Sequence, residues 1–396
     1  MPLLNTSMSR IGTILFKLLC LSQIVLLISI AVSYNLLISI FSYVILIISY
    51  ILFVISFIII LNRQSKDKII YFIILTIISL IISLLFSSYS YRTLVSVLLY
   101  FSMISVWSAY KIVDTKRLNI LLSVVYIIIS VLLIYLSTTD YAYETTINFG
   151  PNKGDTYIGD DLTFGFNNPN EAGIILYFVI VTLTILSIKL KSRLRGFFFI
   201  LILVLIYLLL KTSNRSSLIS LVFVYVLYIF NRNSFSILKK KWILIALILF
   251  SLFFALVYII YGAYYSDLDK MFLGKPLFSG REILFLESYN SFVSSPIIGD
   301  VGTSNFGNSL NGLLTILVNT GLIGLGSYLF FAKYTILSIA RNIQDKSQLF
   351  AFLSIIGVFI NASTESVVLV GGGQWYAFLL TIFLLSSDTS TNDTTG

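Results

Sequence analysis

The chain has 396 residues, of which 58% are hydrophobic and 11% charged, with a formal charge of +9. This composition excludes a soluble globular domain and indicates a membrane protein. It contains no histidine, which removes the usual base near neutral pH, and Cys20 is its single cysteine, which excludes an intramolecular disulfide. Any chemistry would therefore use carboxylates, arginine, lysine, hydroxyl or backbone groups, with no cofactor and no metal expected.

Apolar runs follow one another along most of the chain. Since a membrane helix needs about 20 apolar residues, they predict an all-α, polytopic membrane protein of about twelve transmembrane helices in one membrane domain, 1–396. The first run contains Lys17 and is followed by a second of similar length, which favours an uncleaved span over a signal peptide. The predicted spans are 11–31, 36–61, 69–87, 93–110, 118–137, 172–188, 196–211, 216–231, 242–262, 311–332, 349–369 and 373–387.

Two long polar stretches, 138–171 and 263–310, interrupt this pattern. Lysine and arginine are concentrated in the alternate set of loops, which the positive-inside rule places in the cytoplasm. Both termini are then cytoplasmic, and both polar stretches are large external loops, which we expect to contain short helices. Any chemistry is expected on that external face.

The first external loop ends with Asn170 and Glu171 at the start of an apolar run. Asn170 is a plausible helix N-cap, and Glu171 suits the first turn, where a negative charge is favourable.

A short polar turn, 212–217, separates two further spans. It lies between Lys211 and Arg215, and it could hold a guanidinium at the depth of lipid headgroups, where its planar fork suits a phosphate. Simple snorkelling of both cations to the interface is the alternative.

The second external loop carries the segment 279–289, whose apolar residues fit an amphipathic helix lying on the membrane or on other spans. Ser279 or Gly280 would cap it, so that Arg281 falls in the first turn, where a positive charge opposes the helix dipole. An ordinary surface helix is the alternative. After this helix, Pro296 and Gly299 predict a tight turn, and the glycines within 321–326 predict close helix packing.

Taken in order, these segments resemble the O-antigen ligase/polymerase superfamily, and within it a Wzy-type polysaccharide repeat-unit polymerase. The resemblance covers 165–330 in its motifs and the whole chain in span count and loop placement. Its motifs are Asn-Pro-Asn at 168–170, Ser-Asn-Arg-Ser-Ser-Leu at 213–218, Gly-Arg at 280–281, Ser-Pro-Ile-Ile-Gly-Asp-Val-Gly at 295–302, Asn-Gly-Leu-Leu at 311–314 and Gly-Leu-Ile-Gly at 321–324.

The resemblance implies a transferase that works on the outer face of the bacterial cytoplasmic membrane on undecaprenyl-diphosphate-linked oligosaccharides, for capsule, exopolysaccharide or O-antigen. It implies that arginines matching Arg215 and Arg281 engage the diphosphate. It also leaves room for partnership with other polysaccharide-assembly membrane proteins, and gives no reason to expect nucleic acid. Ligase members carry His-Asn where this chain has Leu310 and Asn311, which favours the polymerase branch.

The predicted site combines these two lines of inference. Glu287 joins Arg215 and Arg281 as a candidate catalytic residue, because a carboxylate could accept the proton of the acceptor hydroxyl. The candidate substrate-binding residues are Arg92, Asn170, Glu171, Lys211, Asn214, Glu282, Asn311 and Glu365. A ligase-type glycan transferase and a lipid-linked oligosaccharide flippase remain as alternative functions.

Overall fold

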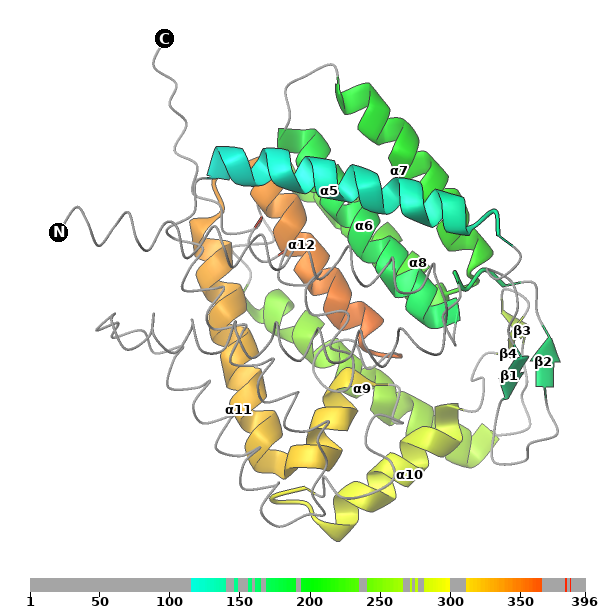
Figure 1. Ribbon diagram of the computed structural model, residues 1–396. Helices are drawn as coiled ribbons and strands as arrows, with labels where there is room; N and C mark the ends of the chain where they lie inside the picture. The colour runs from blue at the N-terminus through cyan, green and yellow to red at the C-terminus, as the bar shows by residue number, and fades with distance from the viewer. Residues whose placement is uncertain are drawn as a thin grey trace, which may run out of the picture.

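The computed structural model is helical throughout most of the part that it describes (Figure 1). The described residues are 115–139, 146–148, 156–158, 161–164, 169–189, 194–234, 241–265, 271–272, 275–276, 281–299, 311–364, 382 and 385. The predicted spans that end before residue 115, the span 373–387 as a whole, and the candidates Arg92 and Glu365 lie outside this part.

Eight helices and two short hairpins make up this part of the chain. The helices are α5 (Thr115–Leu136), α6 (Pro169–Lys189), α7 (Leu194–Lys211), α8 (Arg215–Asn231), α9 (Lys241–Tyr265), α10 (Arg281–Ser294), α11 (Gly312–Asn342) and α12 (Lys346–Asn361). Antiparallel strands β1 (Thr146–Asn148) and β2 (Thr156–Ile158) form one hairpin, and β3 (Met271–Phe272) and β4 (Lys275–Pro276) form the other. Three of the helices, α5 through Asn119–Leu136, α6 and α7, are long and apolar enough to cross a membrane.

The helices predicted between 118 and 369 agree with the structure to within a few residues, apart from two corrections. The predicted span 349–369 ends early, because α12 stops at Asn361. The predicted span 311–332 continues to Asn342 and contains a break. The external loops also differ from expectation, since each contains a β-hairpin and only the second shows a helix, α10, among its described residues.

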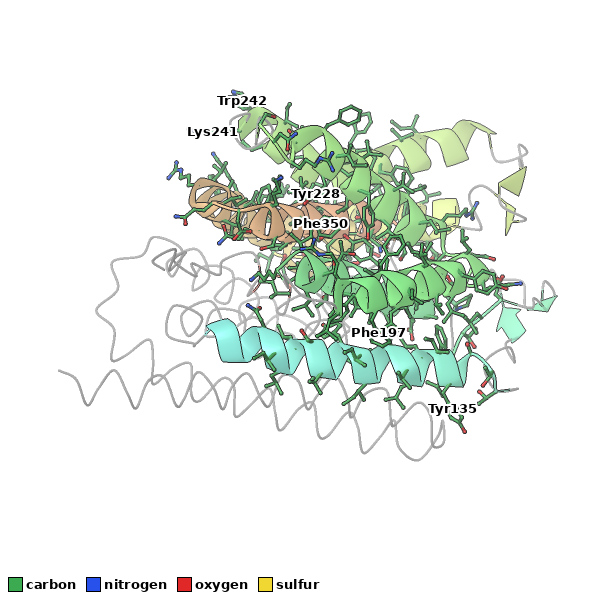
Figure 2. All side chains as sticks on the ribbon, turned by 90° about the horizontal axis from the view of Figure 1, so that it is seen from above. Tyr135, Phe197, Tyr228, Lys241, Trp242 and Phe350 are labelled. Carbon is green, nitrogen blue, oxygen red and sulfur yellow. The ribbon has the colours of Figure 1, made fainter. Side chains whose placement is uncertain are left out.

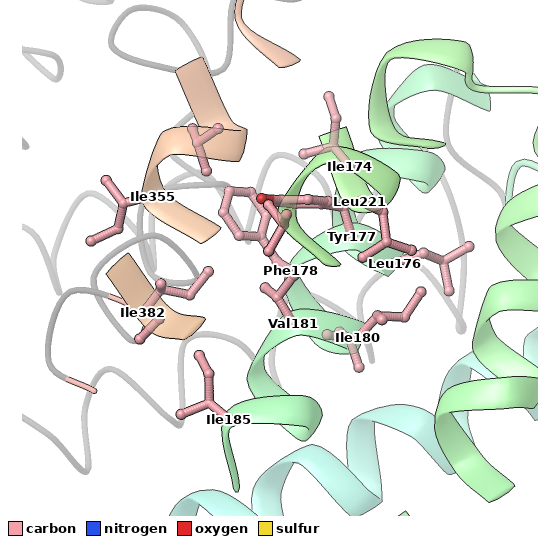
Figure 3. Close-up of a cluster of buried hydrophobic side chains, with 14 of the residues drawn as sticks. Ile174, Leu176, Tyr177, Phe178, Ile180, Val181, Ile185, Leu221, Ile355 and Ile382 are labelled. Carbon is pink, nitrogen blue, oxygen red and sulfur yellow. The ribbon is translucent and has the colours of Figure 1, made fainter. Parts of the chain in front are cut away.

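The core lies around α6, which is buried along nearly its whole length between α7, α8 and α12 (Figure 3). Its Tyr177 hydroxyl donates to the carbonyl of Ser354 on α12 at 2.7 Å. Gly357 allows this close approach, because a Cβ there would overlap the Tyr177 hydroxyl. On the same helix, Phe350 makes T-shaped aromatic contacts with Tyr225 and Tyr228, with ring centroids 5.2 and 5.1 Å apart.

The outer helices behave differently. On α7, Leu205 is buried while Phe199 and Leu203 are exposed, and on α5 Val124 and Val131 are exposed. A helix that is apolar on every face belongs in a large apolar environment, as a membrane provides. The exposed faces of α5 and α7 therefore agree with the membrane-spanning character of these helices.

Successive helices bring alternate termini to the same end of the molecule. In Figure 1 the ends of α5, α7 and α9 lie on the right with the starts of α6 and α10 and with both hairpins. Lys241, at the start of α9, lies at the opposite end from Tyr135, near the end of α5 (Figure 2). The described hairpins and the start of α10, which belong to the predicted external loops, thus lie at one end.

The break in α11 is at Gly321, whose φ of 63° and ψ of −165° lie outside the helical region. The turn after α10 docks against this break: the N–H groups of Leu322 and Ile323 donate to the carbonyls of Pro296 and Ile297, at 2.9 and 3.3 Å. A Cβ at Gly321 would collide with the Ile297 carbonyl. The predicted close packing at the glycines of 321–326 is therefore corrected: Gly321 allows a close approach but at a break in the helix, and Gly326 faces open space.

Candidate functional site

The α7–α8 corner, residues 211–217, is built around a three-residue turn. Ser213 has a φ of 50°, an unusual value for a non-glycine residue, and this turns the chain sharply. Asn214 then caps α8, because its Oδ1 accepts from the Ser217 N–H at 3.0 Å and from the Ser216 hydroxyl at 2.8 Å. The predicted split between two helices is therefore confirmed, with side-chain capping as its cause.

Asn214 also joins α8 to the start of α6. Its Nδ2 donates to the Asn170 carbonyl at 2.7 Å, and the side chain is 1% exposed. Gly173 leaves room for it, since a Cβ there would overlap the Asn214 side chain. The prediction that Asn170 caps α6 is wrong, because the helix already begins at Pro169, whereas the place of Glu171 in the first turn is confirmed.

A third segment, 161–164, completes the corner. Ser213 donates its hydroxyl to Asp161 Oδ1 at 2.6 Å, and the Leu162 N–H donates to the Lys211 carbonyl at 3.0 Å. Asp161 is the one charged residue that is buried among those whose burial the structure describes. It is not among the residues predicted for the site, although apolar Leu162 and Phe164 alternate within a polar loop, a pattern that indicates a docked segment.

Two cationic side chains lie at the surface of this corner. Arg215 is the first residue of α8 and is half-buried. Lys211 is exposed, and its ammonium lies 5.8 Å from the centroid of the Tyr207 ring. The positive end of the α8 dipole lies beside Arg215, whereas Lys211 lies at the negative end of α7. A corner with a guanidinium, an ammonium and a helix N-terminus is suited to an anion such as a phosphate.

Hydrogen bonds extend from the corner to α12 and α11. Asn361, at the end of α12, donates to the Ser217 hydroxyl at 2.9 Å. Asn311 caps α11 through the Leu314 N–H, and its Nδ2 donates to the Ser363 carbonyl at 2.8 Å. Both ends of the fully buried Asn311 side chain thus have protein partners.

Helix α10 begins at Arg281, so the predicted place of this residue in a first turn is confirmed. The helix packs against α9 and α11. Its Glu287 is exposed, whereas the side chains of Arg281 and Glu282 are outside what the structure describes. Convergence of Arg215 and Arg281 on one diphosphate stays a prediction.

The structure therefore brings most of the described candidates together at one end. Asn170, Lys211, Asn214 and Arg215 belong to the corner or contact it directly, and Asn311 is linked to it through α12. Within the described ranges, no group of three or more cysteine, aspartate or glutamate residues is placed to hold a metal ion.

The fold and this polar end define a helical protein with three candidate membrane-spanning helices. Comparison of the chain with protein-family models, curated proteins and solved structures gives no significant match.

Proposed function

We propose that this protein is a polymerase of undecaprenyl-diphosphate-linked oligosaccharide repeat units on the outer face of the bacterial cytoplasmic membrane. The observation that carries the proposal is the α7–α8 corner, where Arg215 begins α8 and Lys211 ends α7, on the end that also holds the hairpins and the start of α10. The motif resemblance described above adds the substrate class. The bilayer and other polysaccharide-assembly membrane proteins are its expected partners.

The reaction suits a site of this kind. A hydroxyl of the acceptor repeat unit forms a bond to the anomeric carbon of the growing glycan, while the bond from that carbon to the carrier diphosphate breaks. The diphosphate leaves with the electron pair, so cations aimed at its oxygens lower the barrier. In the proposal Arg215 and Arg281 bind these oxygens, and Lys211 adds charge.

The hydroxyl proton needs an acceptor, and a carboxylate at the same end could provide one. Glu287 is exposed on α10, and Glu171 lies in the first turn of α6. Glu282 and Glu365 remain further candidates. Asn214, Asn170 and Asn311 hold the helix termini in place, so in this proposal they position the cations.

A flippase is less well supported. It would need charged or strongly polar groups along a route through its spans. Among residues whose burial is described, Asp161 is the one buried charge, and it lies at the corner and not deep in a helix. A ligase is less well supported because the histidine of its motif is absent.

Analysis of the intermediate that accumulates in a deletion strain tests the proposal. Loss of a polymerase leaves single repeat units on the lipid carrier, exposed on the outer leaflet, and abolishes long chains. Loss of a flippase traps single units on the cytoplasmic face, and loss of a ligase leaves long chains on the carrier. Either of the last two results would overturn the proposal.

A further inference from the structure

Helix α10 has three distinct faces, and the first is buried. Phe285 and Ser288 are fully covered, and Phe292 packs on the same small cluster, which includes Val318 of α11. Their spacing of three and four residues places them on one side of the helix. This face attaches α10 to α9 and α11.

The second face is apolar and exposed. Leu286, Tyr289 and Val293 also follow a spacing of three and four residues, and each is more than 40% exposed. Ile297, in the turn that follows the helix, is 60% exposed. Exposure of such a stripe of large apolar side chains to water costs about 25 cal/mol of free energy for each Å².

The third face is polar. Glu287, Asn290 and Ser294 are exposed and share another side of the helix. A helix with one face on the protein, one apolar face and one polar face fits the boundary between acyl chains and water.

The apolar face continues onto the break in α11. Leu322 and Ile323, the two residues after Gly321, are both more than half exposed. Their N–H groups are nevertheless paired, with the carbonyls of Pro296 and Ile297. Lipid offers no hydrogen-bond partner, so an interrupted helix can contact it only when its backbone groups are paired by protein.

We infer that the α10 unit, residues 281–299, dips with Leu322 and Ile323 into the bilayer, so that the apolar face contacts lipid acyl chains and the Glu287 face contacts water. Exposed apolar side chains of the same kind cover the candidate spans α5 and α7, including Val131 and Leu203. The predicted second external loop thus contains a membrane-seated helix, and this inference does not depend on the proposed function.

Spin-label accessibility tests the inference on the full chain in phosphatidylethanolamine–phosphatidylglycerol vesicles. In a Cys20→Ser background, nitroxide labels are placed at Leu286→Cys, Val293→Cys and Ile297→Cys. Matched controls are Glu287→Cys and Ser294→Cys on the polar face, with Leu203→Cys as a lipid reference. Oxygen concentrates among acyl chains and a nickel chelate stays in water, so their ratio should shift toward the Leu203 value at the first three positions and toward water at the other two.

Equal ratios on the two faces would overturn the inference, since α10 would then not lie at the boundary between acyl chains and water. Protection from both reagents at the apolar face would also overturn it, because a second copy of the chain or another segment would then cover the stripe. The unmodified protein gives a second measurement that requires no variant to fold. A lipid-soluble carbene reagent should modify Leu286, Tyr289 and Val293, and absence of label on this peptide contradicts lipid contact.

Discussion

The α7–α8 corner and the α10 unit each present one of the two predicted arginines, and they are held in different ways. In the corner, side chains of Asn214, Ser213 and Asn361 bond to neighbouring segments. In the α10 unit, backbone groups of the 295–299 turn pair with the broken helix α11. The start of α8 is thus held by side-chain hydrogen bonds, whereas the α10 unit is held by a backbone junction together with its packed face, so mutations should separate the two supports.

The comparison assumes that both regions lie on the outer side of the membrane. Cysteines at the exposed residues Thr138 and Glu287, in the Cys20→Ser background, should react with an impermeant thiol reagent on intact cells. A cysteine at the exposed Asn233 should react only after lysis, because it lies at the other end of α8. Reaction of Thr138→Cys and Glu287→Cys from opposite sides would show that the two regions do not share one side of the membrane.

The backbone junction should be the more fragile support. Gly321→Ala places a Cβ against the Ile297 carbonyl in a conformation that only glycine adopts readily, which costs on the order of 3 kcal/mol. We expect a marked fall in melting temperature and loss of the purified protein's monodispersity. Gly326→Ala is the matched control, since nothing lies within 4 Å of its added Cβ. Equal stability of the two variants would show that the junction does not hold α10.

The side-chain support should fail in two steps. Asn214→Ala removes the cap of α8 and the hydrogen bond to the Asn170 carbonyl, for a loss of about 2–3 kcal/mol. Asn214→Ser keeps a capping oxygen and loses the amide donor without burying a charge, so its melting temperature should fall between those of the wild type and the alanine variant. Identical melting of the serine and alanine variants would mean that capping contributes nothing.

The two arginines should respond alike if they bind one diphosphate. Lysine keeps the charge but loses the fork, so Arg215→Lys and Arg281→Lys should each slow polymer formation by about ten- to a hundredfold. Membranes with matched protein levels and a lipid-linked repeat unit provide the assay. Normal rates in both lysine variants would contradict a bidentate guanidinium contact to the diphosphate. Normal rates in the alanine variants would contradict any catalytic role of the two arginines.

Much of the corner could be predicted from the sequence, because its features are local. Hydropathy located the helices on either side, and the polar turn between Lys211 and Arg215 marked their ends. The partners of Asn214 could not be predicted, since Asn170 is 44 residues away and the bond depends on how α6 packs. The burial of Asp161 was missed for the same reason: the alternation of Leu162 and Phe164 indicates a docked segment, but the acid's partner Ser213 is 52 residues away.

The α10 unit was harder to predict. The start of the helix followed from Ser279 and Gly280, but the sequence of α11 resembles a continuous apolar span with small residues. Only the structure shows that Gly321 adopts a positive φ. It also shows that carbonyls of the 295–299 turn accept hydrogen bonds from the N–H groups of Leu322 and Ile323. A broken helix and a packed one share the same glycine-rich pattern, so sequence alone favoured packing.

The smallest expected effect concerns Lys211. Its substitution tests whether the corner binds an anion through the guanidinium of Arg215 or through the ammonium of Lys211. Its ammonium is exposed over Tyr207, where a cation–π contact contributes about 0.5–1 kcal/mol. Lys211→Met removes the charge and should slow polymer formation by about two- to fivefold, whereas Lys211→Arg should stay near the wild-type rate. A loss in Lys211→Met as large as in Arg215→Ala would instead make the ammonium the main anion ligand of the corner, and Arg215 would then serve chiefly to hold the start of α8.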